Sequence, residues 1–342
     1  MNNKVTMGDI AVELGISTVA VSKALSGKNG VSDELRKNIL ETAKKLGYRK
    51  KEKNKKEKKL NTIGVIVASR FLIENRSYYW RLYQEVTIAA NKKHYYTLLE
   101  VIDEESEHSK VEPKLMKQGG LVGMIVLGSF DKGYIDNLNM LSKKPLIALD
   151  SVYEQIKGDA VTADNIEGAY RVTEYIIQSG HKRIGYVGTL KTTPSIDDRY
   201  MGFCKAMFFY GLEINESWII NDRDIKSGKV DDKGCFILPE DMPEAFFCNS
   251  DLSARILMEK LLKKGYKVPE DISVAGFDNY LPDGKVLVPL TTYEADVKGM
   301  AGEAVELISE RMNRNDRPCR VVSIRGKLIE GKSVRKRQAL KS

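Results

Sequence analysis

Four side chains near the N-terminus have the types and spacing needed to contact the edges of DNA bases. They are Thr18, Val19, Ser22 and Lys23. Hydroxyl and ammonium groups hydrogen-bond base edges in the major groove, and an aliphatic side chain contacts the thymine methyl group. Because these positions repeat with the period of an α-helix, they would share one face of it. The surrounding sequence must therefore supply that helix and keep this face exposed.

The segment 10–25 predicts two short helices that cross closely through one tight turn. Ala11, Gly15 four residues later and Val21 six residues after that have the spacing of a helix-turn-helix unit. Val21, Ala24 and Leu25 would then face inward, which leaves the four reading positions outside.

Capping signals predict where three helices begin. Thr6 with Asp9 forms a capping box for the first helix, and Ser17 and Ser32 are the predicted N-caps of the second and third. Gly47 ends the third helix. The expected apolar stripe of that helix is Leu35, Ile39, Leu40, Ala43 and Leu46.

The net charge of the chain lies entirely on this segment. Residues 1–60 hold 15 Lys+Arg and 7 Asp+Glu, whereas residues 61–342 hold 40 of each, and the whole chain carries +8. A small helical unit with only a solvated surface would explain the apolar pattern but not this asymmetry. A polyanion bound by the first 60 residues explains both.

Residues 49–59 predict a basic linker, because eight of these eleven residues are Lys or Arg and none is apolar. A solvated tether and an arm that follows DNA phosphates are both compatible with it, and Lys55 and Lys56 are candidate phosphate contacts.

The cysteine, histidine and acidic residues of the chain predict no bound metal or cofactor. Cys204, Cys235, Cys248 and Cys319 have no metal-ligand spacing, which favours reduced thiols. The three histidines are far apart, and the acidic run 103–108 is more typical of a solvated loop than of acid–base catalysis. No segment approaches the roughly 20 apolar residues of a membrane span. The polar start offers no export signal, so we expect a cytoplasmic protein.

From Ile63 onward, buried strands alternate with amphipathic helices, the pattern of an α/β fold with parallel sheets. Two doubly wound units in series fit the length. The expected strands are 63–68, 96–101, 122–127, 146–149, 184–187, 218–220, 245–248 and 272–277, and the expected helices are 78–93, 109–118, 133–142, 166–179, 199–210 and 251–264. Residues 227–243 predict a loop or a short extended piece.

The chain resembles the LacI/GalR family of bacterial regulators over nearly its whole length. The matching segments are 5–11, 15–26, 31–32, 43–48, 161–165, 180–185, 199–203, 248–251, 268–279 and 289–292. The resemblance implies an N-terminal helix-turn-helix domain followed by a two-lobed periplasmic-binding-protein-like core of two doubly wound parallel sheets. It implies a ligand-responsive regulator, acting as a homodimer on a palindromic operator, and no catalysis.

The resemblance also implies a division of the chain. We expect a DNA-binding domain at 1–48, a linker at 49–61 and an effector-binding core at 62–342. The core would have one lobe at about 62–162 and 296–323 and another at about 163–295 and 324–342, with crossovers near Thr162, Ala295 and Ile324. Relatives usually carry a hinge helix with a Leu inserted into the minor groove; this linker lacks that pattern, and only Leu60 is a candidate for it.

Residues with expected roles follow from the same resemblance. DNA contacts are expected at Thr6, Ser17, Thr18, Val19, Ser22, Lys23, Lys28, Asn29, Tyr48, Lys55 and Lys56. A small effector, a sugar or sugar derivative, is expected to meet Phe71, Tyr78, Tyr79, Trp80, Asp150, Arg199, Asn249, Asp251 and Asp278. Alternatively, Asp278 caps a turn and the aromatic residues 78–80 are helix core.

Two other classes of protein remain in competition. A nucleotide-dependent α/β enzyme would require a phosphate-binding glycine motif, and the chain contains no GxxxxGK[ST] and no GxGxxG after residues 63–68. A transport-type sugar-binding protein shares the cleft but would need an export signal, and it would not carry the basic head.

Overall fold

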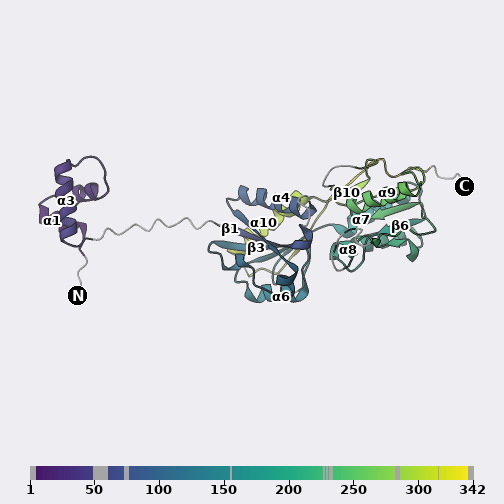
Figure 1. Cartoon of the computed structure of the whole chain (residues 1–342), viewed down its shortest axis with the longest axis horizontal. Coiled ribbons are helices and arrows are strands. Elements are labelled where there is room, and N and C mark those ends of the chain that lie inside the picture. The colour runs from purple at the N-terminus through teal and green to yellow at the C-terminus, as the bar shows by residue number, and fades with distance from the viewer. Residues whose placement is uncertain are drawn as a thin grey trace. The chain divides into compact units, whose positions relative to one another are not determined.

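The computed structural model divides the chain into two compact units, Met1–Lys59 and Leu60–Ser342 (Figure 1). It describes residues 5–48, 61–72, 77–154, 156–225, 228, 230, 234–281, 286–314 and 316–337. Residues 49–60 of the expected linker, which include Lys55, Lys56 and Leu60, lie outside these ranges.

The described residues of the first unit, which we call the head, form three helices: α1 (Met7–Leu14), α2 (Thr18–Leu25) and α3 (Asp33–Lys45). The predicted caps are confirmed. The Thr6 hydroxyl accepts the amide of Asp9 while the Asp9 carboxylate accepts the amide of Thr6, and the Ser17 and Ser32 hydroxyls accept amides of their own helices. Gly15 ends α1 with a φ of 61°, a left-handed conformation that glycine adopts without strain.

A small apolar core holds these helices together. Its buried members are Ile10, Ala11, Val21, Ala24, Ile39 and Ala43. The prediction for Leu40 was wrong, because this side chain is 49% exposed. Leu40 follows Ile39 directly, and one residue turns a helix by roughly 100°, which carries Leu40 off the buried stripe.

The second unit begins with a six-stranded parallel sheet in the order β11-β5-β4-β3-β1-β2. Successive side chains of β1 face opposite sides, and each side is covered: Ile63, Val65 and Val67 pack with α4 and α10, whereas Ile66 and Ala68 pack with α6. We call this sheet with its helices the N-lobe. Its elements are β1 (Thr62–Ala68), β2 (Tyr96–Ile102), β3 (Leu121–Leu127), β4 (Leu146–Leu149), β5 (Ala160–Ala163), β11 (Val321–Ile324), α4 (Tyr78–Lys92), α6 (Lys132–Leu141) and α10 (Val297–Asn313).

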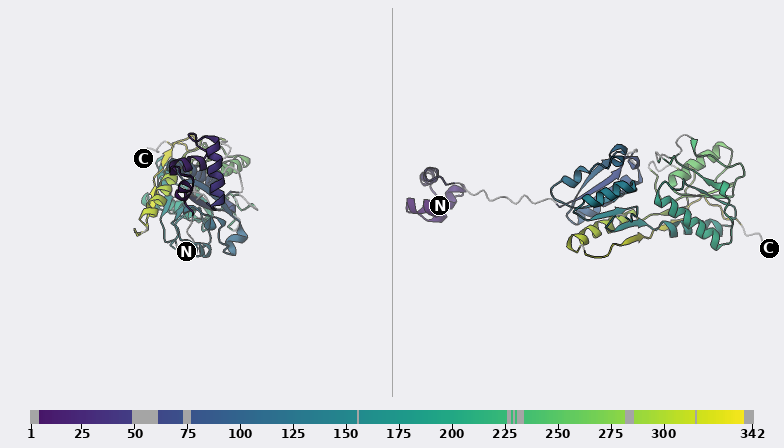
Figure 2. Two further views of the ribbon diagram at one scale, coloured as in Figure 1. Left: turned by 90° about the vertical axis from the view of Figure 1, so that its left-hand side faces the viewer. Right: turned by 90° about the horizontal axis from the view of Figure 1, so that it is seen from below.

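A second parallel sheet, in the order β7-β6-β8-β9, forms the C-lobe (Figure 2). Helices α7 and α8 cover one face and α9 covers the other. A short antiparallel pair, β10 with β12, completes this lobe. Its elements are α7 (Asn165–Gln178), β6 (Ile184–Val187), α8 (Pro194–Phe209), β7 (Ile219–Ile220), β8 (Ala245–Cys248), α9 (Asp251–Lys263), β9 (Ser273–Ala275), β10 (Thr292–Glu294) and β12 (Lys327–Ile329).

The chain passes between the lobes after β5, between β10 and α10, and between β11 and β12. Because α10 returns to the N-lobe and β11 joins the edge of its sheet beside β5, the two lobes are interwoven rather than consecutive. A buried ion pair fixes this edge: the Arg311 guanidinium binds both carboxylate oxygens of Asp159, at 2.8 and 2.6 Å.

The predicted helix at 109–118 was wrong. A short helix, α5 (Glu104–His108), comes earlier, because the Asp103 carboxylate accepts the Ser106 amide at 2.7 Å and starts it there. Only a 3-10 turn, η2 (Lys114–Lys117), follows Pro113. The predicted helix 199–210 begins earlier than expected, at Pro194 with Thr193 as its N-cap, and the predicted strand 272–277 is shorter.

In the expected loop at 227–243, the described residues contain no α-helix, and Val230 makes an antiparallel bridge to Arg223. Trp218, predicted to begin a strand, is instead the buried last residue of 3-10 helix η3 (Glu216–Trp218), and β7 begins at Ile219. Within the described parts of the chain, no helix is long and apolar enough to span a membrane.

Candidate functional site

The outer face of α2 carries the predicted base-reading residues. Thr18, Val19, Ser22 and Lys23 are all exposed, and Val19 is 61% exposed although it is aliphatic. Because the inner face of α2 packs against the small core, this face is held rigidly outward. The arrangement can present these four side chains to the edges of base pairs.

The other predicted DNA contacts of the head fall into two groups. Lys28 and Asn29 are exposed in the turn after α2, whereas Tyr48 is half-buried against the head's core. The hydroxyls of Thr6 and Ser17 already act as helix caps.

Arg36 was not predicted to matter for DNA contacts. Its Nη2 donates to the Lys28 carbonyl at 2.8 Å and its Nη1 to the Ala24 carbonyl at 3.3 Å. It therefore fixes the turn that carries Lys28 and Asn29. Nothing in the sequence spacing indicated this contact.

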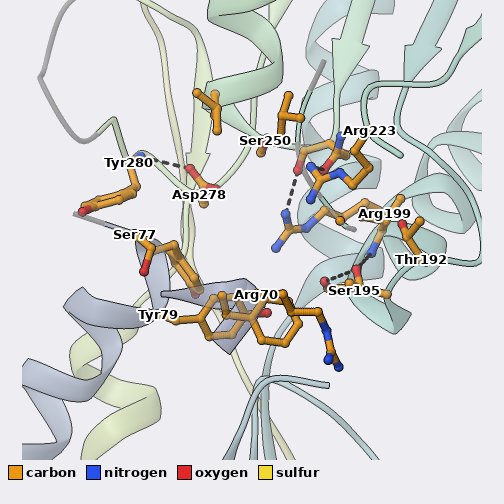
Figure 3. A pocket seen from close by; sticks show the side chains of 18 of the residues that line it. Arg70, Ser77, Tyr79, Thr192, Ser195, Arg199, Arg223, Ser250, Asp278 and Tyr280 are labelled. Atoms are coloured by element: carbon orange, nitrogen blue, oxygen red, sulfur yellow. Dashed lines mark hydrogen bonds between the residues drawn. The ribbon is translucent and has the colours of Figure 1, made fainter. Parts of the chain in front are cut away.

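A cavity of about 630 Å³ is lined by both lobes of the second unit (Figure 3). It opens where several strands end: Phe71 follows β1, Asp150 follows β4, Asn249 follows β8 and Asp278 lies just beyond β9. Carboxyl ends of parallel strands are where ligands bind in α/β sheets, and this volume is typical of a small-molecule site.

The structure brings seven of the nine predicted effector residues together on this cavity. They are Phe71, Tyr78, Tyr79, Asp150, Arg199, Asn249 and Asp278. Trp80 and Asp251 are not among the lining residues. Trp80 turns along α4 toward Tyr83, with ring centroids 5.6 Å apart. The buried Asp251 carboxylate instead accepts the Thr292 hydroxyl at 2.6 Å and the Tyr280 amide at 3.2 Å.

Arg199 is a buried guanidinium held by uncharged groups. Its Nε donates to Asn165 Oδ1 at 2.9 Å and its Nη1 to the Asn249 carbonyl at 2.6 Å. The guanidinium carbon lies 4.0 Å from the centre of the Phe277 ring. These contacts fix the side chain and leave Nη2 without a hydrogen bond from the described parts of the chain.

Two carboxyl groups line the cavity with their pKa values raised. Burial raises the pKa of Asp150 to about 6, although Arg199 and the Tyr79 hydroxyl oppose the shift. Burial likewise raises the pKa of Asp278 to about 7, against Arg199 and the hydrogen bond from the Tyr280 amide. Near neutral pH, Asp278 is therefore protonated in a substantial fraction of molecules, whereas Asp150 remains mostly ionised.

A buried polar network on the C-lobe side was missed by the sequence analysis. Asp222 is fully buried, and its carboxylate binds Arg223 Nη2 at 2.7 Å, Asn249 Nδ2 at 2.7 Å and the Ser253 hydroxyl at 2.5 Å. Burial would raise the pKa of Asp222, but Arg223 and these hydrogen bonds outweigh it and hold the pKa below its usual range.

This network changes the role expected for Asn249. The side-chain nitrogen of Asn249 donates to Asp222, its side-chain oxygen accepts from Arg223, and its backbone carbonyl accepts from Arg199. Asn249 therefore positions the two arginines of this wall. Arg223 itself lines the cavity. The sequence signal for Arg223 was a charged pair with Asp222, separated from the two-residue strand β7 by one residue.

A second missed ion pair lies on the N-lobe side. Arg70 Nη1 binds Glu107 at 2.5 Å, and its Nη2 donates to the Ser129 carbonyl at 2.6 Å. The acidic run expected to be a solvated loop therefore includes a buried carboxylate, which also accepts the Asp131 amide at 2.7 Å. The pair holds Arg70 beside the Phe71 ring, at 5.0 Å, on the cavity wall.

Aromatic rings form much of the N-lobe wall. The rings of Phe71 and Tyr79 lie 4.5 Å apart, and Tyr78 meets Tyr280 of the C-lobe edge to face at 6.2 Å. Gly128 permits this packing, because a Cβ at that position would lie 2.8 Å from the Tyr79 ring. The contact between Tyr78 and Tyr280 bridges the two lobes at the cavity.

Hydroxyl side chains at three helix starts were also missed. Ser77, Thr193 and Ser250 are the N-caps of α4, α8 and α9, and each lines the cavity. Capping patterns could have located them. Within the described residues, no group of His, Cys, Asp or Glu side chains has the geometry of a metal site.

Two family profiles match the chain. Residues 6–51 match the bacterial regulatory proteins of the lacI family, and residues 173–334 match a periplasmic binding protein-like domain. The HTH-type transcriptional repressor PurR of Pasteurella multocida is 27% identical over 335 residues, covering 97% of this chain and 99% of the repressor. PurR of Mannheimia succiniciproducens is 25% identical over 334 residues, covering 97% and 99%.

Solved structures share the fold at low identity. The CelR regulator in complex with cellobiose has a TM-score of 0.66 at 19% identity, covering 96% of this chain and all of that one. The lac repressor dimer bound to operator and the anti-inducer ONPF has a TM-score of 0.65 at 19% identity, covering 97% and 100%. With the helix-turn-helix head and the two-lobed cavity, these matches show that the chain belongs to the LacI family of bacterial regulatory proteins and is a ligand-responsive transcriptional regulator, not an enzyme.

Proposed function

We propose that this regulator is a repressor whose effector is a small sugar or sugar derivative. The observation that carries the proposal is that two residues lining the cavity, Tyr78 and Asp150, have buried polar atoms with no hydrogen-bond partner among the described residues. These atoms are Tyr78 Oη and Asp150 Oδ1. Such atoms are costly unless a ligand or water satisfies them.

A polyhydroxylated ring matches this wall. Hydroxyls both donate and accept, so they can pair with a carboxylate, a phenol and the open Nη2 of Arg199 together. The faces of Phe71 and Tyr79 would cover the C–H side of the ring. The fold neighbours include a regulator from Enterococcus faecium with bound ribose, at a TM-score of 0.65 and 20% identity.

A panel of pentoses, hexoses, disaccharides and purine bases, screened by thermal shift and then by calorimetry, tests this proposal. Ligands that bind only the folded state raise the unfolding midpoint. We expect a sugar to shift it with saturation. The aromatic wall could equally take a flat nitrogen heterocycle, so a shift with purine bases and with no sugar would contradict the sugar assignment.

We further propose that the protein is a cytoplasmic homodimer in which each head binds half of a palindromic operator. A single helix-turn-helix unit offers too small an interface for tight specific binding, and a two-fold symmetric dimer supplies a second unit for the other half of the operator. A dimeric mass in solution at micromolar concentration is the expected result, and a monomeric mass there would contradict it.

Lys23→Ala is expected to weaken operator binding by about 1–3 kcal/mol while random DNA loses little, because Lys23 would bind a base edge. The operator can be obtained by selecting bound sequences from random DNA. Lys44→Ala, an exposed lysine on α3, serves as the matched control. Equal losses on operator and random DNA would show that Lys23 contacts phosphate instead.

A further inference from the structure

Several arginine side chains line the cavity beside two carboxyl groups. The described lining residues include Arg70, Arg199, Arg223 and Arg255, together with Asp150 and Asp278. Arg70 forms an ion pair with Glu107, and Arg223 forms one with Asp222, so the charges of these two arginines are balanced. The capacity of the cavity to bind an anion therefore depends on which guanidinium nitrogens remain open to a ligand.

Arg199 forms no ion pair with the described residues. It is only 6% exposed, and its charge acts on Asp150 and Asp278 without direct contact. Its hydrogen-bond acceptors are neutral oxygens of Asn165 and Asn249. A buried charge is normally paired, because its desolvation is otherwise expensive.

Arg223 lies on the same side of the cavity as Arg199, across from Asp278 and Tyr280 (Figure 3). Its Nε and Nη2 bind Asp222 and Asn249, which fixes the plane of the guanidinium. Its Nη1 makes no hydrogen bond within the described residues. Two oriented guanidinium groups on one wall, each with an open terminal nitrogen, form a site suited to anionic oxygens.

The N-termini of three helices add positive electrostatic potential at this cavity. The N-caps of α4, α8 and α9 all line it, and these helices are 15, 16 and 13 residues long. The partial positive charge of a helix N-terminus favours anions nearby. Ser195 places a further hydroxyl beside Arg199, whereas the Thr192 hydroxyl already donates to the Thr189 carbonyl at 2.5 Å.

We propose that the effector is an acidic sugar, whose carboxylate or phosphate group binds Arg199 and Arg223 while its hydroxyls meet Asp278, Asp150 and Tyr78. This assignment rests on the proposed function, since it specifies the chemical class of the sugar. The cavity then has an anion-binding wall in the C-lobe and a hydroxyl-binding region along the carboxylates and aromatic residues.

Calorimetry on the full chain with matched probes tests the assignment. D-glucose, D-galactose and D-ribose would be compared with D-glucuronate, D-galacturonate, D-glucose 6-phosphate and D-ribose 5-phosphate, with acetate and inorganic phosphate alongside. We expect at least one acidic sugar to bind about tenfold or more tightly than its neutral parent. The uronate and phosphate arms distinguish the two anionic groups. Affinity for the acidic sugar should fall with added salt, whereas affinity for its parent should not.

Variants locate the anion site. Arg223→Gln should bring the acidic sugar and its parent to similar affinities, and Asp222→Asn with Arg223→Gln removes the carboxylate that the single change would leave buried and unpaired. Arg171→Gln, an exposed arginine on α7, is the matched control and should retain the preference.

Each outcome bears on one part of the proposal. A neutral parent that binds as tightly as its acid overturns the anion assignment but leaves the sugar function standing. Acetate or phosphate binding as tightly as any acidic sugar supports the anion site and contradicts the sugar function. A failure of every sugar and anion to bind overturns both.

Discussion

Arg199→Met is expected to lower affinity for the tightest-binding sugar by about two orders of magnitude. The change removes a buried guanidinium that offers charged hydrogen bonds, each contributing about 1.5–3 kcal/mol. Met keeps much of the apolar stem, so the packing over Phe277 is preserved better than with Ala. Calorimetric titration of both proteins measures the effect.

The same change should destabilise the ligand-free core modestly. Asn165 Oδ1 and the Asn249 carbonyl would lose their donor, at a cost of about 1–3 kcal/mol for each buried acceptor left unpaired. Circular dichroism and thermal unfolding therefore accompany the titration. If the folded variant has a dissociation constant within about threefold of wild type, Arg199 does not bind the sugar.

Asp278→Asn is expected to lower the affinity for the sugar by about 10- to 100-fold. The same change is expected to stabilise the ligand-free core against unfolding at pH 8. The first effect follows from losing a charged acceptor. The second follows because a carboxyl whose pKa is raised by burial opposes folding when it must ionise. Asn tolerates the left-handed backbone at this position, where φ is 89°.

The stabilisation should depend on pH in a defined direction. The folded-state pKa of Asp278 is about 7, above the ordinary value of 3.8, so its favourable contribution is complete below the ordinary value and is lost as pH rises toward 7. Unfolding free energies of wild type and Asp278→Asn, compared from pH 4 to 8, isolate this group. The difference should grow in favour of the variant up to about pH 7 and then level off. A difference that does not change with pH would contradict the assigned pKa.

The helices of the head and the positions of most core strands along the chain could be predicted because local rules determine them. Capping pairs such as Thr6 with Asp9, and runs such as 146–149, carry their signal within a few residues. The cavity residues could be predicted for a related reason, since polar side chains after parallel strands converge at one edge of a sheet.

The remaining features depend on contacts between distant segments. The pairing of Arg70 with Glu107 joins residues 37 apart, and nothing in the acidic run distinguishes Glu107 from its solvated neighbours. The network around Asp222 joins β7, β8 and α9. Trp80 was misplaced because adjacent helical residues point about 100° apart, so Tyr79 faces the cavity and Trp80 does not.

The central claim is that occupation of the cavity between the lobes changes the affinity of the heads for DNA. Operator affinity with and without the tightest-binding sugar, measured by fluorescence anisotropy for wild type, Asp278→Asn and the control Arg171→Gln, tests it most directly. We expect the sugar to change the affinity of wild type and Arg171→Gln by about 5- to 150-fold, the usual range for coupled sites, and Asp278→Asn to require at least tenfold more sugar for the same change. An operator affinity that stays constant while the sugar saturates the cavity, or an Asp278→Asn variant that responds at the wild-type concentration, would contradict the claim.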